Sequence, residues 1–226
     1  MENSILKDGN YHLPLPIRSP EKNVPNNRQQ VVQRTVWLKK KLLRNEQIHN
    51  DYHNFIEDII AKGFAKVAEK PPTADRTWYI PHHGVYHPQK PGKIRVVFDC
   101  SIKHKGYCLN QEVLQGPDLT NQLVGVLLRF RQEPIAVMAD VESMFYQVKV
   151  HEEYHDYLRF VWWPGGDLSK ELVDYQLRVH LQGASSSPSC ANFALRKTAD
   201  DNEHIYGKEA GDILRRKVCA KLEVSG

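Results

Sequence analysis

The residues best suited to chemistry lie around Asp140. Five apolar residues, Ile135–Ala139, precede this aspartate, and such a run is typical of a short strand that is buried on both faces. A carboxylate at the end of a buried strand is costly unless a cation meets it, so Asp140 is a candidate metal ligand. Phe145 and Tyr146 follow a few residues later. Taken alone the motif is short, and an aspartate that caps the following turn is the more common explanation.

A second candidate site is a basic hairpin. The turn-forming segment Pro88–Lys93 separates Val85–His87 from Ile94–Asp99, and this pattern predicts two strands joined by a basic tip. Lys93 and Arg95 alternate with apolar neighbours, so both side chains should point to one face. Two cations on one face could bind a triphosphate, with arginine donating two parallel hydrogen bonds and lysine contributing a compact positive charge. A strand edge protected by charge fits the hairpin equally well.

A third candidate lies in the segment His180–Ser189. A glycine and a run of serines lead into Pro188, which suits the first turn of a helix. Small residues at such a point let backbone N–H groups approach a bound nucleotide closely. Gln182 could donate or accept a hydrogen bond with a sugar or a base. In isolation, a plain capped loop is the preferred interpretation.

Two helices should precede the hairpin. The first is predicted to begin at Pro25–Asn27, with an asparagine as its N-cap, and to bury a face that carries Val32, Val36 and Leu43. The second is predicted to end at Gly63, which suits the position after a helix. Its buried face would carry four apolar residues spaced four, three and four apart: Ile48, Tyr52, Phe55 and Ile59.

A helix and a pair of strands should surround the Asp140 segment. Asp118 is a candidate cap for a helix with one apolar face, made of Leu119, Leu123, Leu127 and Phe130. Arg159–Trp163 and Tyr175–Val179 are predicted to form a second strand pair. Trp162 and Trp163 could stack on bases. For at least one of them, packing in the core is the better explanation.

Length and composition bound the class of protein. The chain has 226 residues and 41% hydrophobic content, which suits one large or two small globular domains. No apolar run reaches the roughly 20 residues that a membrane helix needs, and the N-terminus has no signal-peptide core. The four cysteines have no close paired spacing, so we expect reduced thiols in an intracellular protein of the cytoplasm or nucleus: Cys100, Cys108, Cys190 and Cys219.

The charge is unevenly distributed along the chain. Residues 1–95 contain 16 Lys and Arg against 9 Asp and Glu, whereas residues 96–226 contain 15 against 18. A basic N-terminal part and an acidic C-terminal part suit a protein that binds phosphates with its basic part and carries out catalysis with its acidic part. A solvated basic surface, including the Lys39–Lys41 triplet, is the simpler explanation of charge alone. The histidines near Cys100 and Cys108 match no compact zinc finger.

Taken in order, these motifs resemble the reverse transcriptases of retroelements. The order is the basic strand, the Asp140 motif with its aromatic pair, and the glycine turn before a proline-started helix. Longer segments are similar to the BEL/Pao class of LTR retrotransposons, and the similarity covers roughly residues 10–210. These segments are Leu13–Pro16, Pro25–Arg28, Tyr79–Pro88, Leu114–Thr120 and Pro188–Leu195.

The resemblance implies an α+β fold with an antiparallel sheet and flanking helices, as in the fingers and palm of a right-hand polymerase. Residues 1–131 would form an N-terminal extension and fingers, and residues 132–226 a partial palm. The implied activity is RNA-directed DNA polymerisation, a nucleotidyltransferase reaction, with Mg²⁺ as cofactor. The implied partners are a template-primer of RNA or DNA and a deoxynucleoside triphosphate, without a membrane.

The resemblance also assigns roles to single residues. Asp140 would be a catalytic ligand of Mg²⁺, with the Val141 carbonyl beside it. Arg95 and Lys93 would contact the triphosphate. Phe145 would exclude a 2′-hydroxyl by its shape, and Gln182 would lie near the incoming sugar.

One family feature has no counterpart in this sequence. The family places Tyr-x-Asp-Asp soon after the glycine turn, and residues 1–226 contain no such motif. Asp200–Asp201 lies in a polar stretch that favours a solvated helix end instead. One carboxylate cannot hold two Mg²⁺ ions for in-line transfer. We therefore expect a truncated or degenerate copy that is catalytically incomplete as this chain, or a non-catalytic nucleic-acid- or nucleotide-binding remnant.

Overall fold

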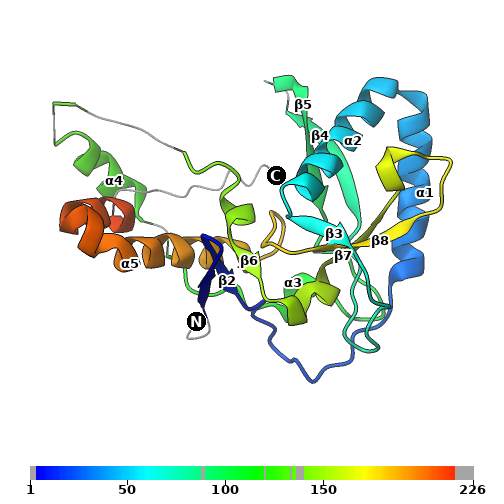
Figure 1. The fold of residues 1–226 in the computed structure, drawn as a ribbon, viewed down its shortest axis with the longest axis horizontal. Coiled ribbons are helices and arrows are strands. Elements are labelled where there is room, and N and C mark those ends of the chain that lie inside the picture. Colours follow the sequence, from blue (N-terminus) through cyan, green and yellow to red (C-terminus); the bar gives the residue numbers. More distant parts are fainter. Residues whose placement is uncertain (1–3, 88–89, 120, 133, 136–139, 217–226) are drawn as a thin grey trace.

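The computed structural model describes residues 4–87, 90–119, 121–132, 134–135 and 140–216. It is a mixed α+β structure with three small sheets, which confirms the predicted class in its general form. Figure 1 shows a packed body, with α1, α2 and most strands, and an extension on the other side that carries α4 and α5. The predicted division after residue 131 stays a prediction, although two sheets combine strands from both sides of it.

The sheets bring together distant parts of the chain. The first has the order β1 (Ile5–Lys7), β2 (Asn10–Leu13) and β6 (Lys149–Val150), with β2 and β6 parallel. The second has the order β3 (Ala65–Val67), β8 (Val173–Leu177) and β7 (Arg159–Trp162), all antiparallel. The third is the hairpin of β4 (His82–His87) and β5 (Lys90–Phe98). The predicted hairpin and strand pair are both confirmed.

Helix α1 (Arg28–Arg44) begins after Asn27, as predicted, but Asn27 does not cap it through its side chain. Instead the Asn27 amide donates to the Tyr79 carbonyl at 2.8 Å and accepts from the Tyr79 N–H at 2.8 Å. The predicted buried face was wrong by one position. Val31, Thr35 and Leu42 are buried, while Val36 and Leu43 are 44% and 66% exposed. Both apolar rows have helical spacing, so only the docking of α1 chooses between them.

Helix α2 (Glu46–Ala61) has the ends and the buried face that the sequence indicates. The Asn45 side chain accepts from the Ile48 N–H at 3.0 Å and caps its start. Gly63 follows its end with a φ of +68°, which a glycine adopts without strain. Tyr52 and Ile59 are buried as predicted, and Ile48 and Phe55 pack against the same core.

The core of the body is aromatic. Trp162 stacks on Tyr52 with ring centroids 5.1 Å apart, and Phe160 packs edge-on against Phe98 at 5.3 Å. Trp162 and Trp163 are 0% and 2% exposed, so both belong to the core and neither is available to stack on a base. The alternative in which these tryptophans face a nucleic acid was wrong.

The remaining helices are short or lie in the extension. They are α3 (Leu109–Glu112), α4 (Leu123–Phe130), η1 (Met144–Gln147), η2 (Glu152–Leu158), η3 (Pro164–Gly166) and α5 (Ser187–Arg216). The predicted Asp118 cap was wrong, because α4 begins after Gln122. Leu123, Leu127 and Phe130 lie within α4 at the predicted helical spacing, whereas Leu119 lies outside it, and α4 has no buried residue. Helix α5 starts at the predicted proline turn and bends at Gly207.

Two further sequence features can be placed. Cys100, Cys108 and Cys190 are buried free thiols, and Cys219 lies outside the described residues. Within the part of the chain that the structure describes, no helix has the length and apolar character to cross a membrane.

Candidate functional site

Asp140 lies in an irregular, exposed segment. Of the strand predicted before it, residues 136–139 lie outside the described part, and Ile135 is 81% exposed in a bend, so the prediction of burial was wrong at Ile135. Val141 is 41% exposed. Among the described residues, none forms a hydrogen bond or an ion pair with the Asp140 carboxylate. The carboxylate is therefore open to a cation from solvent.

The turn after Asp140 sends two aromatic side chains in different directions. Ser143 adopts a left-handed φ of 51°, and the Gln147 amide donates to the Glu142 carbonyl at 3.0 Å, which closes the turn that η1 forms. Phe145 packs in a small apolar cluster with β2 and the first part of α5: Tyr11, Leu13, Val148, Cys190, Ala191 and Ala194. Phe145 therefore lies beside the helix that follows the glycine turn, and its predicted role stays a prediction.

Tyr146 turns toward the body instead. Its ring lies 5.3 Å from that of Phe64, centroid to centroid. Burial raises the pKa of Tyr146 to about 12, and the nearby Cys100 adds to this rise. The phenol is therefore neutral at physiological pH. Tyr146 packs against the core cluster that contains Cys100, which comes two residues after β5, so the turn after Asp140 and the end of the hairpin share one core.

The predicted glycine turn meets the same end of the hairpin. Gly183 has a φ of +109°, and a Cβ placed there would lie 2.6 Å from the Phe98 carbonyl oxygen. Asn110 holds the turn, because its amide donates to the Gly183 carbonyl at 2.9 Å and accepts from the Ser185 N–H at 3.0 Å. Gln182 is exposed at the tip of this turn. Only glycine permits so close an approach of the two backbones.

The basic strand has the predicted alternation where the structure describes it. Ile94 and Val96 are 8% and 4% exposed and Arg95 between them is exposed, opposite Val85 in the register. Arg95 forms no ion pair with any described residue. The side chain of Lys93 lies outside the described part, so its predicted partnership with Arg95 is untested.

The structure thus brings together three of the predicted motifs in part. The end of β5 and the glycine turn meet at Phe98 and Gly183, and Tyr146 of the aromatic turn packs against the core cluster that contains Phe98. No contact in the described part joins Asp140 to Arg95 or to the Gln182 side chain.

The described residues do not fit a complete magnesium site. None of them forms a group of three or more metal-binding side chains, whereas two-metal transfer needs several carboxylates. The tempting pair Asp200–Asp201 lies within α5 rather than at a solvated helix end. Asp201 accepts from Tyr11 at 2.8 Å and Lys197 at 2.6 Å, and Asp200 pairs with Arg215 at 2.8 Å.

Sequence reasoning missed a buried ionic network in the body. Arg159 is 1% exposed; its Nη2 lies 2.7 Å from Asp156 Oδ1 and its Nη1 lies 3.7 Å from Asp174 Oδ2. Arg28 and the Tyr79 hydroxyl also bind Asp174, at 2.8 and 2.5 Å. Asp156 is three positions from Arg159, but Asp174 lies 15 positions from Arg159, 95 from Tyr79 and 146 from Arg28, so spacing carried no signal that they would meet.

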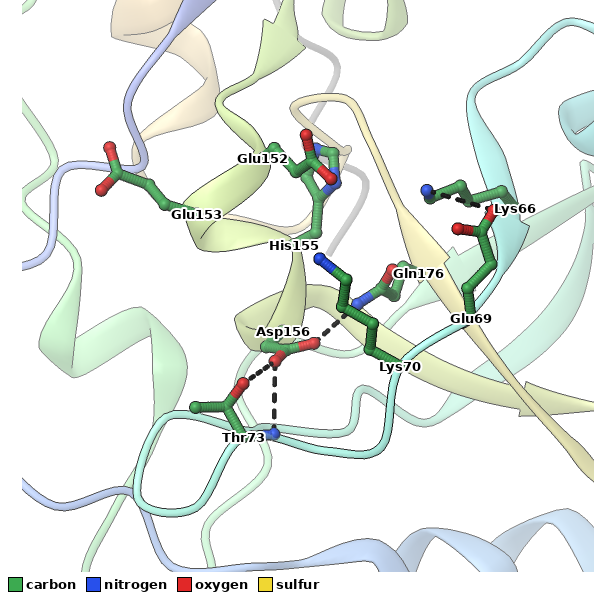
Figure 2. A pocket seen from close by; sticks show the side chains of 9 residues that line it. All are labelled: Lys66, Glu69, Lys70, Thr73, Glu152, Glu153, His155, Asp156 and Gln176. Atoms are coloured by element: carbon green, nitrogen blue, oxygen red, sulfur yellow. Dashed lines mark hydrogen bonds and ion pairs between the residues drawn. The ribbon is translucent and has the colours of Figure 1, made fainter.

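Asp156 also lies at the edge of a cavity of about 250 Å³ (Figure 2). Burial opposes ionisation of Asp156, but hydrogen bonds from Thr73, Arg159 and Gln176 outweigh it, so its pKa is lowered. The lining mixes both signs of charge and gives no preference for one class of ligand: Lys66, Glu69, Lys70, Thr73, Glu152, Glu153, His155, Asp156 and Gln176.

Comparison with known proteins adds no independent family assignment. No family model matches the chain, and no curated protein matches it. The resemblance to reverse transcriptases therefore depends on the sequence motifs.

Proposed function

We propose that this chain is the fingers and part of the palm of a reverse-transcriptase-like domain, related by ancestry to the polymerases of BEL/Pao retrotransposons. The observation that carries the proposal is that three distant segments pack together: Gly183 meets Phe98, and Tyr146 packs against the core cluster that contains Phe98. In nucleotidyl transfer, the triphosphate, sugar and base of one nucleotide must be held side by side. Segments with a basic strand, an aromatic turn and a small-residue turn suit these three tasks.

The surroundings of single side chains support this arrangement. Arg95 is exposed without an ion-pair partner in the described part, so its guanidinium is available to phosphate oxygens. Gln182 is exposed at the tip of a turn that Asn110 holds rigid. Phe145 is fixed by the cluster that includes Ala191 and Ala194, and a fixed ring can exclude a 2′-hydroxyl by shape.

The surroundings of Asp140 favour nucleotide binding, rather than catalysis, as the activity of residues 1–226. Its carboxylate is solitary among the described residues, and residues 1–226 hold no Tyr-x-Asp-Asp. We therefore propose that the 226-residue chain binds a deoxynucleoside triphosphate and template-primer without transferring a nucleotide. The residues that the structure describes do not form a two-metal Mg²⁺ site.

A nucleotide-binding titration tests the proposal. A fluorescent 2′-deoxyadenosine triphosphate should bind at low salt, and Arg95→Gln should weaken binding about tenfold, since one charge-assisted phosphate contact is lost. Arg76→Gln, which removes an exposed arginine elsewhere, is the matched control and should change little. Absence of binding at low salt, or equal losses in both variants, would contradict the proposal.

Primer extension tests the catalytic part separately. With Mg²⁺, an RNA template and a DNA primer, the chain alone should incorporate no deoxynucleotide above background. Robust incorporation that an Asp140→Asn change abolishes would overturn catalytic incompleteness while keeping the polymerase ancestry.

A further inference from the structure

Helix α1 presents an unusual outer surface. Its 17 residues include six basic and no acidic side chains. Trp37 is 76% exposed, whereas Trp78, Trp162 and Trp163 are 0–2% exposed. Burial of a large aromatic side chain typically stabilises a protein by about 1.5–3 kcal/mol, and Trp37 does not make this contribution within the chain. Its ring is therefore available to a binding partner.

The cations around Trp37 are only partly used within the protein. Arg28 and Arg34, near the start of α1, pair with Asp174 and Asp99. Lys40, Lys41 and Arg44 are exposed and form no ion pair with any residue that the structure describes. The unmatched positive charge is therefore concentrated in the second half of the helix, next to the tryptophan.

These side chains form one row. Arg34, Trp37, Lys41 and Arg44 are spaced three, four and three residues apart, so they lie along one side of α1. Lys40 lies next to this row. A 17-residue helix is roughly 25 Å long, so the row can follow an extended partner over several of its repeating units.

The loop that follows β5 adds basic residues next to the Trp37 row of α1. Gln30 donates to the Lys103 carbonyl at 3.3 Å, and Arg34 reaches Asp99 at 3.2 Å, so residues 99–106 lie against the first half of α1. This loop adds two exposed lysines, Lys103 and Lys105. The basic surface therefore starts near the end of β5 and continues along α1.

We propose that this outer face of α1 binds single-stranded nucleic acid, with a base stacked on Trp37 and phosphates held by Lys40, Lys41 and Arg44. Exposed cations match a polyanion, and an exposed indole matches unpaired bases, which can leave a stack to contact a ring. A duplex keeps its bases stacked and offers none to Trp37. The surface lies outside the proposed nucleotide site, so it extends the proposed function and can be tested without it.

The same features fit an anionic membrane less well. A helix that lies in a membrane surface inserts a continuous apolar face, whereas the apolar face of α1 with Val31 and Leu42 is buried in the protein. On the outer surface, Val36 and Leu43 lie apart from the Trp37 row, with Lys40 between them and the row. No broad apolar surface remains for insertion.

The first experiment uses the full chain and a fluorescein-labelled single-stranded RNA of mixed sequence. Binding measured by anisotropy should weaken about tenfold in Trp37→Ala, since one base stack is lost, and should largely return in Trp37→Tyr. The combined Lys40→Gln, Lys41→Gln and Arg44→Gln change should lower the slope of log K against log salt by about 2.

Two matched controls accompany these variants. Tyr206→Ala removes another exposed aromatic ring, which is 72% exposed on α5. Lys7→Gln, Lys170→Gln and Lys208→Gln together remove three other exposed cations. Both controls should retain the wild-type affinity for RNA and the wild-type salt slope.

Intrinsic fluorescence gives a readout that does not depend on mutant folding. Because Trp37 is the exposed tryptophan, RNA should quench the wild-type emission, and unlabelled duplex RNA of equal length should not. Equal affinities in the α1 and control variants, no quenching by RNA, or Trp37-dependent sedimentation with phosphatidylserine vesicles instead of RNA binding would overturn the proposal. Failure of the nucleotide titration alone would affect only the proposed function.

Discussion

The body and the extension use apolar residues in opposite ways (Figure 1). In the body, large side chains such as Trp78, Trp162 and Phe160 are 0% exposed and pack on one another. In the extension, α4 buries none of its residues, and Leu128 is 67% exposed. Packed apolar area is the main source of folding free energy. The body therefore supplies most of the stability of this chain, and α4 contributes little to it.

The two regions also differ in where they place charges. The body buries Arg159 between two carboxylates, whereas Arg215 in α5 pairs with Asp200 and Glu203 at the surface. A buried ion pair is strongly destabilising when one partner is lost, and an exposed pair contributes little. Matched changes in the two regions should therefore have unequal effects.

The largest expected effect is that of Arg159→Met. The change leaves Asp156 and Asp174 without their buried partner and should lower the free energy of unfolding by about 3–5 kcal/mol. Arg215→Met should change the free energy of unfolding far less, because its partners' side chains are partly exposed and solvent screens the ion pairs. Urea unfolding followed by circular dichroism measures both. Equal effects would remove the distinction between body and extension.

An intermediate effect should follow from pH. Burial lowers the pKa of His82 and of His180 from 6.5 to about 4. The unfolded chain thus binds more protons between pH 6.5 and 4, so stability is full above pH 6.5 and falls as the pH drops through this range. Between pH 7 and pH 5, each of these histidines should lower the free energy of unfolding by about 2 kcal/mol.

The variant His180→Leu tests this pH dependence. Neither ring nitrogen of His180 has a hydrogen-bond partner within the described part of the chain, so an apolar replacement should be tolerated at pH 7. It should also remove roughly half of the stability loss measured by urea unfolding between pH 7 and pH 5. A stability curve that is flat over this range in the wild type would show that these imidazoles are not buried as neutral groups.

The smallest expected effect is that of Leu128→Ala in α4, within about 0.5 kcal/mol, because the side chain is 67% exposed. Its reference is Leu42→Ala in α1, where the same side chain is 1% exposed and the loss should be about 2–5 kcal/mol. Thermal or urea unfolding compares the two. A large loss for Leu128→Ala would mean that α4 is packed in solution, which would end the contrast between the regions.

Local chemistry in the sequence was enough to predict several elements and their ends. Gly63 and Pro188 mark helix boundaries because each restricts the backbone within one turn. The β4–β5 hairpin and the β7–β8 pair were predicted from alternation and turn residues. These signals act between neighbours in the chain, so they need no knowledge of the fold.

The candidate site was predictable only as a set of separate motifs. The sequence singled out Gln182 and Phe145, but it carried no sign that Asn110 would hold the glycine turn or that Gly183 would approach Phe98. These contacts join residues 73 to 85 positions apart. Their formation depends on how the hairpin, the turn and α5 are packed together.

The sequence by itself determined where α1 begins and where α2 ends, that a basic hairpin precedes Asp140, and that a small-residue turn precedes α5. The tertiary structure decided which row of α1 is buried, that Trp162 and Trp163 share the core, and that the apolar residues of α4 remain exposed. The physical reason is that helix and strand signals arise from neighbouring residues, whereas burial depends on which surfaces distant elements cover.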